Sequence, residues 1–492
     1  MKLQTLPLPR HATGLLASLL LLAGCSVAPA YDKPGIATPA AFKEAAPVDA
    51  NWKPAEPADS AARGEWWQVF GDPVLDRLEQ DAIAANPDLL AAAARLGQAR
   101  ALEQSARAAR FPQVGVGFGP TRQRPSPASQ GLEADADTRA TTLWRGQATI
   151  AYEVDLFGRL ASAEEAARLD TERRAALFGA TLLSLQADVA QAYFLIRELD
   201  AAQALYGNVV KLRADTVKLL QRRFEEGDIA ELDLARARSE LAAARSESLG
   251  LSRQRALAEH ALAILLGKQP AEFNLPAIMP LGRLSIEVPA GLPSALLERR
   301  PDIAAAERAM AAANARVGVA RAAWFPRLSL TGALGYESDG LGDLFKYASR
   351  SFVFGPLVGT ALSLPIFDGG AREASVNQAR SAYVEDSARY RQTVLQAFRE
   401  VEDNLAQLRI LGEQHREQDS AVGSAERAAR IARLQYREGA VSYLNVIDAE
   451  RSVLQQQRLA VGLDGERARS TVNLIRALGG GWTAPSKAPA AG

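Results

Sequence analysis

The sequence predicts a mainly α-helical protein with a membrane β-barrel part, built as a tandem duplication of one unit. Proline is absent from residues 128–269 and 366–484, and both stretches carry the apolar spacing of long helices. Two pairs of other segments alternate apolar and polar residues with the period of β-strands. Short motifs of the first half return 210 to 214 residues later. The chain is 48% hydrophobic but only 6% aromatic, which suits closely packed Ala- and Leu-rich helices rather than a polytopic helical membrane protein.

The first 24 residues have the pattern of a signal peptide. A basic start precedes an apolar run at 14–22, which is far shorter than the roughly 20 residues that span a bilayer. The run leads into a Leu-Ala-Gly-Cys motif that resembles a bacterial lipobox and ends at Cys25, the only cysteine of the chain. We therefore expect a covalent lipid on Cys25, and Ser26 after it predicts sorting to the outer membrane. The alternative is an ordinary secretory signal with a chance cysteine.

Internal repetition divides the mature chain into two copies of one unit. The Asn-Pro-Asp motif at 86–88 returns as Arg-Pro-Asp at 300–302, and Glu-Gly-Asp at 226–228 returns as Glu-Gly-Ala at 438–440. A nearly constant displacement over the whole length indicates tandem duplication. The predicted parts are a signal peptide (1–24), a lipidated N-terminal segment (25–85), a first repeat (86–267), a connector (268–299), a second repeat (300–480) and a tail (481–492).

Each repeat is predicted to hold one long helix and one composite helix of similar height. Residues from about 160 to 226 give some 67 residues of helical pattern, or roughly 100 Å. The return helix at about 228–266 covers roughly 60 Å by the same rise per residue. A helix of about 23 residues that begins at Pro87, or at Pro301 in the second repeat, supplies most of the difference. A Phe-Pro pair ends each of these shorter helices.

Each repeat also contains two predicted strands, at 113–119 and 143–157 in the first repeat and at 327–336 and 351–366 in the second. One face of these strands is apolar, while small and polar residues occupy the other. Membrane barrels use strands of about 9–11 residues that alternate in this way. The alternative is two β-hairpins packed on a soluble core. The predicted apolar face of the longer strands consists of Trp144, Ala148, Ile150, Tyr152, Val154, Leu156, Phe352, Phe354, Val358, Leu362, Leu364 and Ile366.

Four strands cannot close a barrel, so the membrane interpretation requires an oligomer. Two chains would supply eight strands and three chains would supply twelve. Gly115, Gly117 and Gly119 superficially suggest a nucleotide-binding loop, but they alternate within a strand and no helix follows. We interpret them as small residues that line a lumen.

Composition and motifs argue against several other classes of protein. The 57 basic and 57 acidic residues give zero net charge, which argues against nucleic-acid binding. One Cys and three His leave too few ligands for a Cys/His metal site. No G-x-S-x-G motif occurs, Gly267-Lys268 lacks the rest of a phosphate loop, and His260 and His415 stand alone in helical runs. We therefore expect no enzyme, no metal and no cofactor. A structural envelope stalk or trimeric adhesin is the alternative of a different class; it would explain the helices but not the strands.

Several local motifs follow one another in a fixed order along the mature chain. They are Trp66-Trp67, Asn86-Pro87-Asp88, Arg300-Pro301-Asp302, Phe325-Pro326, Pro365-Ile366-Phe367-Asp368-Gly369-Gly370, Tyr436-Arg437-Glu438-Gly439 and Tyr443-Leu444-Asn445-Val446-Ile447-Asp448-Ala449. Together with the Cys25 segment and the duplication, they resemble the TolC family of outer-membrane efflux ducts, specifically its lipoprotein branch of the OprM and NodT type. The resemblance covers essentially the whole mature chain.

The resemblance implies a homotrimer with a twelve-stranded outer-membrane β-barrel and a twelve-helix periplasmic α-barrel. An equatorial belt would come from the N-terminal segment, the connector and the tail. The implied partners are a periplasmic adaptor (membrane fusion protein), an inner-membrane transporter of the resistance-nodulation-division (RND) type, and outer-membrane lipid. Drugs or toxic solutes would pass through passively. Within this class, the alternatives are the exit duct of a heavy-metal efflux or a type I secretion system.

The turns at Gly227-Asp228 and Gly439-Ala440 are predicted to form the periplasmic tip that contacts the adaptor, because glycine tolerates a sharp reversal. After the second turn, Leu444 and Asp448 lie one helical turn apart and share a face. If that face points inward in a trimer, it forms an apolar ring and an acidic ring, which close a pore and favour cations.

Family position assigns Leu444 and Asp448 to a periplasmic gate, with Tyr436 and Arg451 as neighbours that hold the helices together. Asp233 of the first repeat belongs to the same predicted gate. The corresponding position of the second repeat is Asn445, so the acidic residues of the gate differ between the two repeats. The alternative for Asp448 is a solvated carboxylate paired with Arg451 or Arg236, worth under about 1 kcal/mol.

Overall fold

The computed structural model describes residues 27–33, 35, 38, 39, 41–44, 64–277, 299–354 and 361–480. The predicted signal peptide, Cys25, part of the N-terminal segment (chiefly 45–63), most of the connector and the tail lie outside the described residues. Within the described ranges, no helix is both long enough and apolar enough to cross a membrane.

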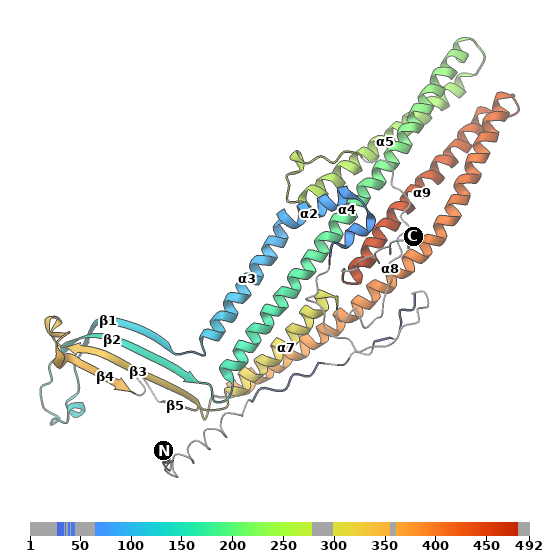
Figure 1. Cartoon of the computed structure of the whole chain (residues 1–492). Helices are drawn as coiled ribbons and strands as arrows, with labels where there is room; N and C mark the ends of the chain where they lie inside the picture. The colour runs from blue at the N-terminus through green and yellow to red at the C-terminus, as the bar shows by residue number, and fades with distance from the viewer. Residues whose placement is uncertain are drawn as a thin grey trace, which may run out of the picture. The chain divides into compact units, whose positions relative to one another are not determined.

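Helices of equal length recur in the two halves of the chain (Figure 1). The long helices have 67 residues each, the return helices 35 each, and the short helices 22 each, as the duplication predicted. In the first half these are α4 (Arg159–Glu225), α5 (Glu231–Leu265) and α3 (Pro87–Ala108), and in the second half α8 (Ala371–Arg437), α9 (Tyr443–Ala477) and α7 (Pro301–Ala322).

Two strands stand between the short helix and the long helix of the first repeat, β1 (Gln113–Gln123) and β2 (Thr141–Val154). The second repeat places β3 (Arg327–Ser338), β4 (Arg350–Phe354) and the short β5 (Leu362–Ser363) in the same position. A 3-10 turn, η1 (Trp66–Phe70), and helix α2 (Pro73–Ala85) precede the first repeat. The other 3-10 turns are η2 (Pro127–Gln130), η3 (Pro270–Glu272), η4 (Leu341–Asp343) and η5 (Tyr347–Ser349).

The chain forms two compact units, and each unit contains parts of both repeats. The first comprises Met1–Gly35, Leu96–Arg174 and Ala306–Tyr390, and it holds the sheet. The second comprises Ile36–Arg95, Ala175–Ala305 and Arg391–Gly492, and it holds the hairpin turns and the largest apolar core. The short helices α3 and α7 and the long helices α4 and α8 contribute residues to both units, whereas the return helices α5 and α9 belong to the second unit alone.

The sheet of the first unit is antiparallel throughout, with the strand order β1-β2-β3-β4 and β5 paired to the far end of β3. Its register separates the two faces that the sequence pattern predicted. One row of cross-strand partners is Val116, Ala148, Leu334 and Phe352, and the adjacent row is Gly117, Gln147, Gly335 and Ser351. Apolar side chains therefore share one face of the sheet and small or polar residues share the other. The predicted alternation is confirmed.

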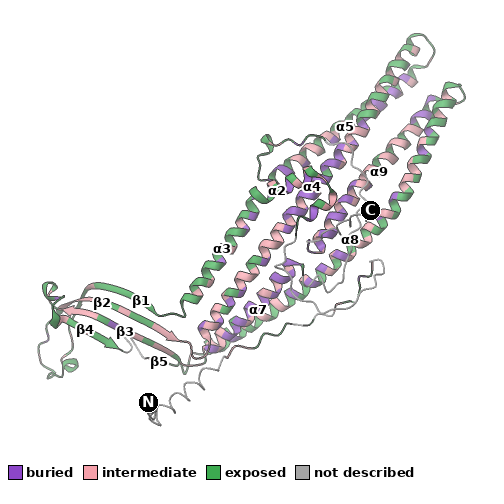
Figure 2. Cartoon of the chain, in the orientation of Figure 1, coloured by how far each residue is buried: buried purple, intermediate pink, exposed green. Residues whose placement is uncertain are grey.

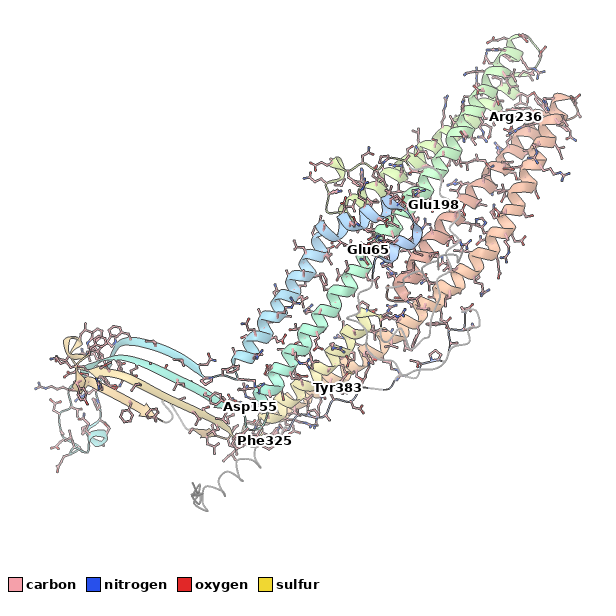
Figure 3. All side chains as sticks on the ribbon, in the orientation of Figure 1. Glu65, Asp155, Glu198, Arg236, Phe325 and Tyr383 are labelled. Atoms are coloured by element: carbon pink, nitrogen blue, oxygen red, sulfur yellow. The ribbon has the colours of Figure 1, made fainter. Side chains whose placement is uncertain are left out.

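The strand boundaries differ from the prediction most clearly at three places. β1 continues past Gly119 to Gln123, because Pro120 lies on an edge strand, where a missing N–H is tolerated. β2 ends at Val154, since the Asp155 carboxylate accepts a 2.7 Å hydrogen bond from the Ala161 amide and so caps α4 (Figure 3). The predicted strand 351–366 is present as β4 and β5, and residues 355–360 between them lie outside the described part.

Alanine-rich contacts and a docked N-terminal segment hold the helical part of the first unit. Ala166 and Leu169 of α4 pack against Ala311, Ala312 and Ala315 of α7. The phenol of Tyr31 donates a 2.7 Å hydrogen bond to Glu307, and Asn314 donates to the carbonyl oxygen of Pro29 at 3.0 Å. Residues of the N-terminal segment therefore lie directly against α7.

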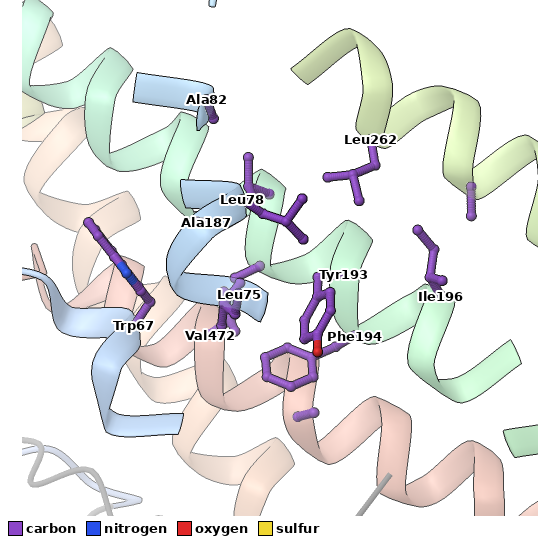
Figure 4. Close-up of a cluster of buried hydrophobic side chains, with 14 of the residues drawn as sticks. Trp67, Leu75, Leu78, Ala82, Ala187, Tyr193, Phe194, Ile196, Leu262 and Val472 are labelled. Atoms are coloured by element: carbon purple, nitrogen blue, oxygen red, sulfur yellow. The ribbon is translucent and has the colours of Figure 1, made fainter. Parts of the chain in front are cut away.

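The core of the second unit gathers where η1 and α2 pack on α4, α5 and α9 (Figures 2 and 4). Trp66 is buried there, and its indole N–H donates to Gln186 at 3.0 Å. The phenol of Tyr193 donates to Asp72 at 2.6 Å, and Asp72 in turn caps α2. Other buried members are Trp67, Leu75, Leu78, Ala82, Ala187, Phe194, Ile196, Leu262 and Val472.

The predicted composite helices are joined by side chains at corresponding positions. Asn86, before α3, donates to the carbonyl oxygen of Leu265 at the end of α5 at 2.9 Å. Arg300, before α7, donates to the carbonyl oxygen of Ala477 at the end of α9 at 3.0 Å. Arg300 also pairs with Glu400 at 2.7 Å. The two repeats thus make the same helix-to-helix connection, the first through the side-chain amide of Asn86 and the second through the buried guanidinium of Arg300.

Candidate functional site at the hairpin turns

Both helical hairpins end in turns of the same geometry, which join α4 to α5 and α8 to α9 (Figure 1). Gly227 has φ +81° and Gly439 has φ +74°, in the left-handed region that glycine adopts without strain. Asp228 and Ala440, which follow these glycines, each donate a 2.8 Å backbone hydrogen bond to a carbonyl five residues earlier. The four residues predicted for the tip therefore lie in the two turns.

A small apolar core closes both hairpins just below the turns. The Tyr436 ring of α8 packs on this core, with its centroid 5.4 Å from that of Tyr443 on α9. Burial, with Glu450 adding to it, raises the pKa of Tyr443 to about 12, so the phenol is neutral near pH 7. Residues of both repeats meet in this core. Its buried members are Leu220, Leu234, Ala237, Tyr443, Val446 and Ile447.

Glu240 on α5 links this helix to α4 and α9 through contacts with two arginines. Its side chain is only 11% exposed and forms an ion pair with Arg213 of α4 at 3.0 Å. Arg451 of α9 donates through Nε to the same carboxylate at 3.0 Å. The hydrogen bond to Glu240 raises the pKa of Arg451, which therefore stays cationic. Arg451 thus links the second repeat to the first through a mostly buried carboxylate.

Leu444 and Asp448 lie together on a face of α9 that points away from the apolar core. Leu444 is 39% exposed, although its neighbours Val446 and Ile447 are buried. The Asp448 side chain is 60% exposed and lies 3.6 Å from Arg451. The pair thus shares one solvent-facing side of the helix. The Asp448–Arg451 contact is also the pairing that the solvated-carboxylate alternative expects.

The predicted gate residue on the other hairpin is separate from this pair. Asp233 lies in the first turn of α5 and contacts Arg236 at 3.9 Å. Within one chain, the structure therefore brings Tyr436, Arg451 and Asp448 into one neighbourhood on the second hairpin, and Asp233 pairs within its own helix.

Sequence reasoning did not identify Glu240 and Arg213. The position of Glu240 in the second repeat is Ser452, so the duplication carries no matching acid that would draw attention to it. A glutamate among alanines and arginines on a helix resembles an ordinary solvated residue. Only the packing of α4, α5 and α9 shows that it is nearly buried between two guanidinium groups.

A groove lies beside these residues, between α4 and the α8–α9 hairpin. It has a volume of about 390 Å³ and is bordered by arginines and glutamates around an apolar floor. The charged and apolar side chains that line it include Leu212, Arg213, Arg430, Arg433, Glu450 and Leu454. Such a surface can accept a helix that carries both apolar and charged side chains.

Histidine and acidic residues give no metal site in the part of the chain that the structure describes. His415 nevertheless does not stand alone, as the sequence had suggested. Its Nε2 lies 2.8 Å from Asp464 of α9, and its Nδ1 lies 3.5 Å from Asp419. Because the two carboxylates contact opposite ring nitrogens, they cannot converge with the imidazole on one ion. His415 is a polar link between α8 and α9.

Comparison with known proteins agrees with this architecture. The model of the family described as outer membrane efflux protein matches residues 78–268 and 292–480. The antibiotic efflux pump outer membrane protein ArpC of Pseudomonas putida is 35% identical over 478 residues, 95% of each chain. The toluene efflux pump outer membrane protein TtgC of Pseudomonas putida is similar to the same extent.

Solved structures agree as well. The outer-membrane channel OprN superposes with a TM-score of 0.83 at 31% identity, covering 93% of this chain and 100% of that one. Both the order of elements and the sequence are thus shared over nearly the full length. The resemblance inferred from the sequence is confirmed: this chain belongs to the outer membrane efflux protein family and is an outer-membrane efflux duct.

Proposed function

We propose that three copies of the chain form the exit duct of a tripartite efflux pump of the RND type. The observation that carries the proposal is the five-stranded sheet, in which β4 and β5 both pair with the same side of β3. It has one apolar and one small or polar face, and within the described residues it has an open edge at β1 and another at β4 and β5. Open edges of this kind are satisfied when copies pair edge to edge into a closed barrel. Twelve strands from three chains would give such a barrel.

The dimensions and aromatic residues of the sheet support a membrane position. β1, β2 and β3 have 11, 14 and 12 residues, enough for a tilted membrane strand of about 9–11 residues. At the loop end, the rings of Phe118 and Trp144 stack with centroids 6.0 Å apart. At the helix end, those of Phe157 and Phe325 stack at 4.6 Å. Two aromatic levels flanking an apolar band are typical of outer-membrane barrels.

Exposed apolar side chains support assembly of the helices. Leu249, Leu257 and Ile264 are 71%, 60% and 64% exposed and recur on one face of α5. Leu395 and Ile410 of α8 are each 50% exposed. A single chain leaves these surfaces in water, so we propose that neighbouring copies cover them to form a twelve-helix periplasmic barrel.

The remaining roles follow from position in this duct. A lipid on Cys25 would anchor each copy, and the duct itself would conduct solutes passively without a cofactor. A periplasmic adaptor would contact the turns at Gly227 and Gly439. Leu444 and Asp448 would form the closed gate, with Tyr436, Arg451 and Asp233 as supporting residues. By analogy with the antibiotic and toluene pumps of the relatives, the cargo would be drugs or other toxic solutes.

The test is the size, location and conductance of the native assembly. Envelopes would be fractionated, extracted in mild detergent and measured by multi-angle light scattering and single-channel recording. We expect an outer-membrane particle with the mass of three chains that conducts ions. A monomer, or an oligomer that does not conduct, would contradict the proposal.

A further inference from the structure

Among the described residues, charge on the small and polar face of the sheet, here called the inner face, is confined to two levels. Alternation and register place the odd-numbered residues of β1, β2 and β3 on the small and polar face. Near the loop end this face carries Arg145 and Glu337, and near the helix end it carries Glu153 and Arg327. The three rows between these levels are uncharged. Their members are Gly117, Gln147, Gly335 and Ser351, then Gly115, Thr149, Ala333 and Val353, then Gln113, Ala151 and Thr331.

Arg145 and Glu337 form a direct cross-strand pair. They are register partners on β2 and β3, and the Nε of Arg145 donates to Glu337 Oε2 at 2.7 Å. Their side chains are 38% and 32% exposed, so both remain accessible to solvent while they neutralise each other. Gly119 is the neighbour of Arg145 on the β1 side, so no third side chain covers the pair from that strand.

We propose that the Arg145–Glu337 pair sets the charge selectivity of the outer mouth of the duct. The inference rests on the proposed function, because it requires three copies that place this face toward a lumen. Each copy then contributes one cation and one anion to a ring whose net charge is zero. Solutes of either sign cross this level without a net electrostatic barrier, which suits an exit for cargo of varied charge.

The paired arrangement makes the ring sensitive to loss of either partner. Glu337→Gln leaves an amide oxygen that can still accept the hydrogen bond from Arg145, so the strand contact persists while three positive charges become uncompensated. Arg145→Gln leaves three negative charges. Because the rows below are uncharged, nothing on this face next to the ring offsets the change. A purely structural cross-strand pair would instead affect the stability of the sheet and leave charge selectivity unchanged.

The experiment measures how fast charged thiol reagents reach a cysteine below the ring from outside intact cells. Gly117→Cys supplies the target, since a Cβ at Gly117 meets no atom within 4 Å and the row lies just below the pair. The chain contains no cysteine other than Cys25, which we expect to be blocked by lipid. The probes are an anionic sulfonatoethyl and a cationic trimethylammonioethyl methanethiosulfonate, and the readout is the ratio of their reaction rates.

We expect Glu337→Gln to raise the ratio of anionic to cationic rates by roughly fivefold and Arg145→Gln to lower it by a similar factor. The double variant should return to the original ratio, and high salt should reduce both shifts. Arg122→Gln is the matched control, because Arg122 lies on β1 near the same end but on the opposite face.

The outcomes separate this inference from the proposed function. If Gly117→Cys reacts from outside but the ratio is the same in all variants, the pair has no selectivity role and the inference is wrong, while the duct stands. If the cysteine reacts only after denaturation, the inner face is not an open lumen, and both the duct and the inference fail.

Discussion

A Cβ on Gly335 would lie 2.2 Å from the carbonyl oxygen of Gly146 on the neighbouring strand. The obstructing atoms are backbone atoms, including the Cα of Gln147 at 2.7 Å, so no side chain can move aside. The contact lies at the β2–β3 pairing, where the strands of the two repeats meet. Glycine at 335 is therefore a condition for joining the repeats into one sheet.

Gly335→Ala is expected to weaken the sheet by about 1–3 kcal/mol or more, because the strands must separate to admit a methyl group. The measurement is the temperature at which the purified assembly dissociates. Gly117→Ala is the control: it lies in the same cross-strand row, and its Cβ would meet no atom within 4 Å. Equal dissociation temperatures for the two variants would contradict this account.

Asn86→Ala should destabilise the junction between α5 and α3. The substitution removes the hydrogen bond to the carbonyl oxygen of Leu265 and the one that the Asn86 side chain accepts from the Leu89 amide. Loss of a helix cap alone costs about 1 kcal/mol, and the freed Leu265 carbonyl adds to that. Thermal unfolding followed by circular dichroism measures the effect. Asp88→Ala, at an exposed position on the same helix, should change it little.

Arg300→Met should be more harmful than Asn86→Ala. Arg300 pairs with Asp302 and Glu400, and its removal leaves two carboxylates without their cation as well as a free Ala477 carbonyl. Breaking a buried ion cluster from one side costs about 3–5 kcal/mol, reduced here by the partial exposure of both carboxylates. Comparing the unfolding temperatures of the two variants tests this prediction. A lower unfolding temperature for Asn86→Ala than for Arg300→Met would contradict it.

Leu444→Ala combined with Asp448→Ala should increase single-channel conductance, because the substitutions remove the proposed apolar and acidic rings of the closed gate. Asp215→Ala is the control, since Asp215 is an exposed acid on α4 that pairs only locally with Lys218. Glu240→Gln should also raise the open probability, by weakening its pairing with Arg213 and Arg451. If neither the Leu444/Asp448 double variant nor Glu240→Gln changes the channel current, the gate does not lie at the tip of α9.

Glu79 makes the stability of the second unit depend on pH. The residue is fully buried, and its carboxyl oxygens have no hydrogen-bond partner among the described residues. Burial, with Asp76 nearby, raises the pKa of Glu79 to about 9. A pKa raised above its unfolded value favours the protonated folded form, so this contribution to stability is complete below about pH 4.5 and is lost as the pH rises toward 9.

Glu79→Leu should therefore be more stable than the unmodified protein at pH 8, and the difference in unfolding temperature should shrink toward pH 5. Differential scanning fluorimetry across that range measures it. Asp88→Asn, at an exposed position nearby in sequence, should leave the pH profile unchanged. A difference that is the same at both pH values would show that Glu79 is not the titrating group.

Local patterns were sufficient for the elements and for the family. Proline and glycine positions predicted where the 67-residue helices end, because proline restricts and glycine relaxes the backbone conformation at its own position. Alternation divided the strands into two faces, since side chains alternate by covalent geometry. Helix lengths predicted the composite helices, because a return helix and a short helix together nearly match the length of the long helix.

Long-range partners were decided only by tertiary structure. Nothing local distinguishes Glu240, or Glu79, from a solvated glutamate, because burial is a property of the neighbours that surround a residue. Register decided that Arg145 meets Glu337, since a shift of one residue would turn every side chain of a strand to the other face. The sequence by itself therefore determined the elements and the kind of protein, whereas packing between distant segments decided which charges are paired, buried or exposed.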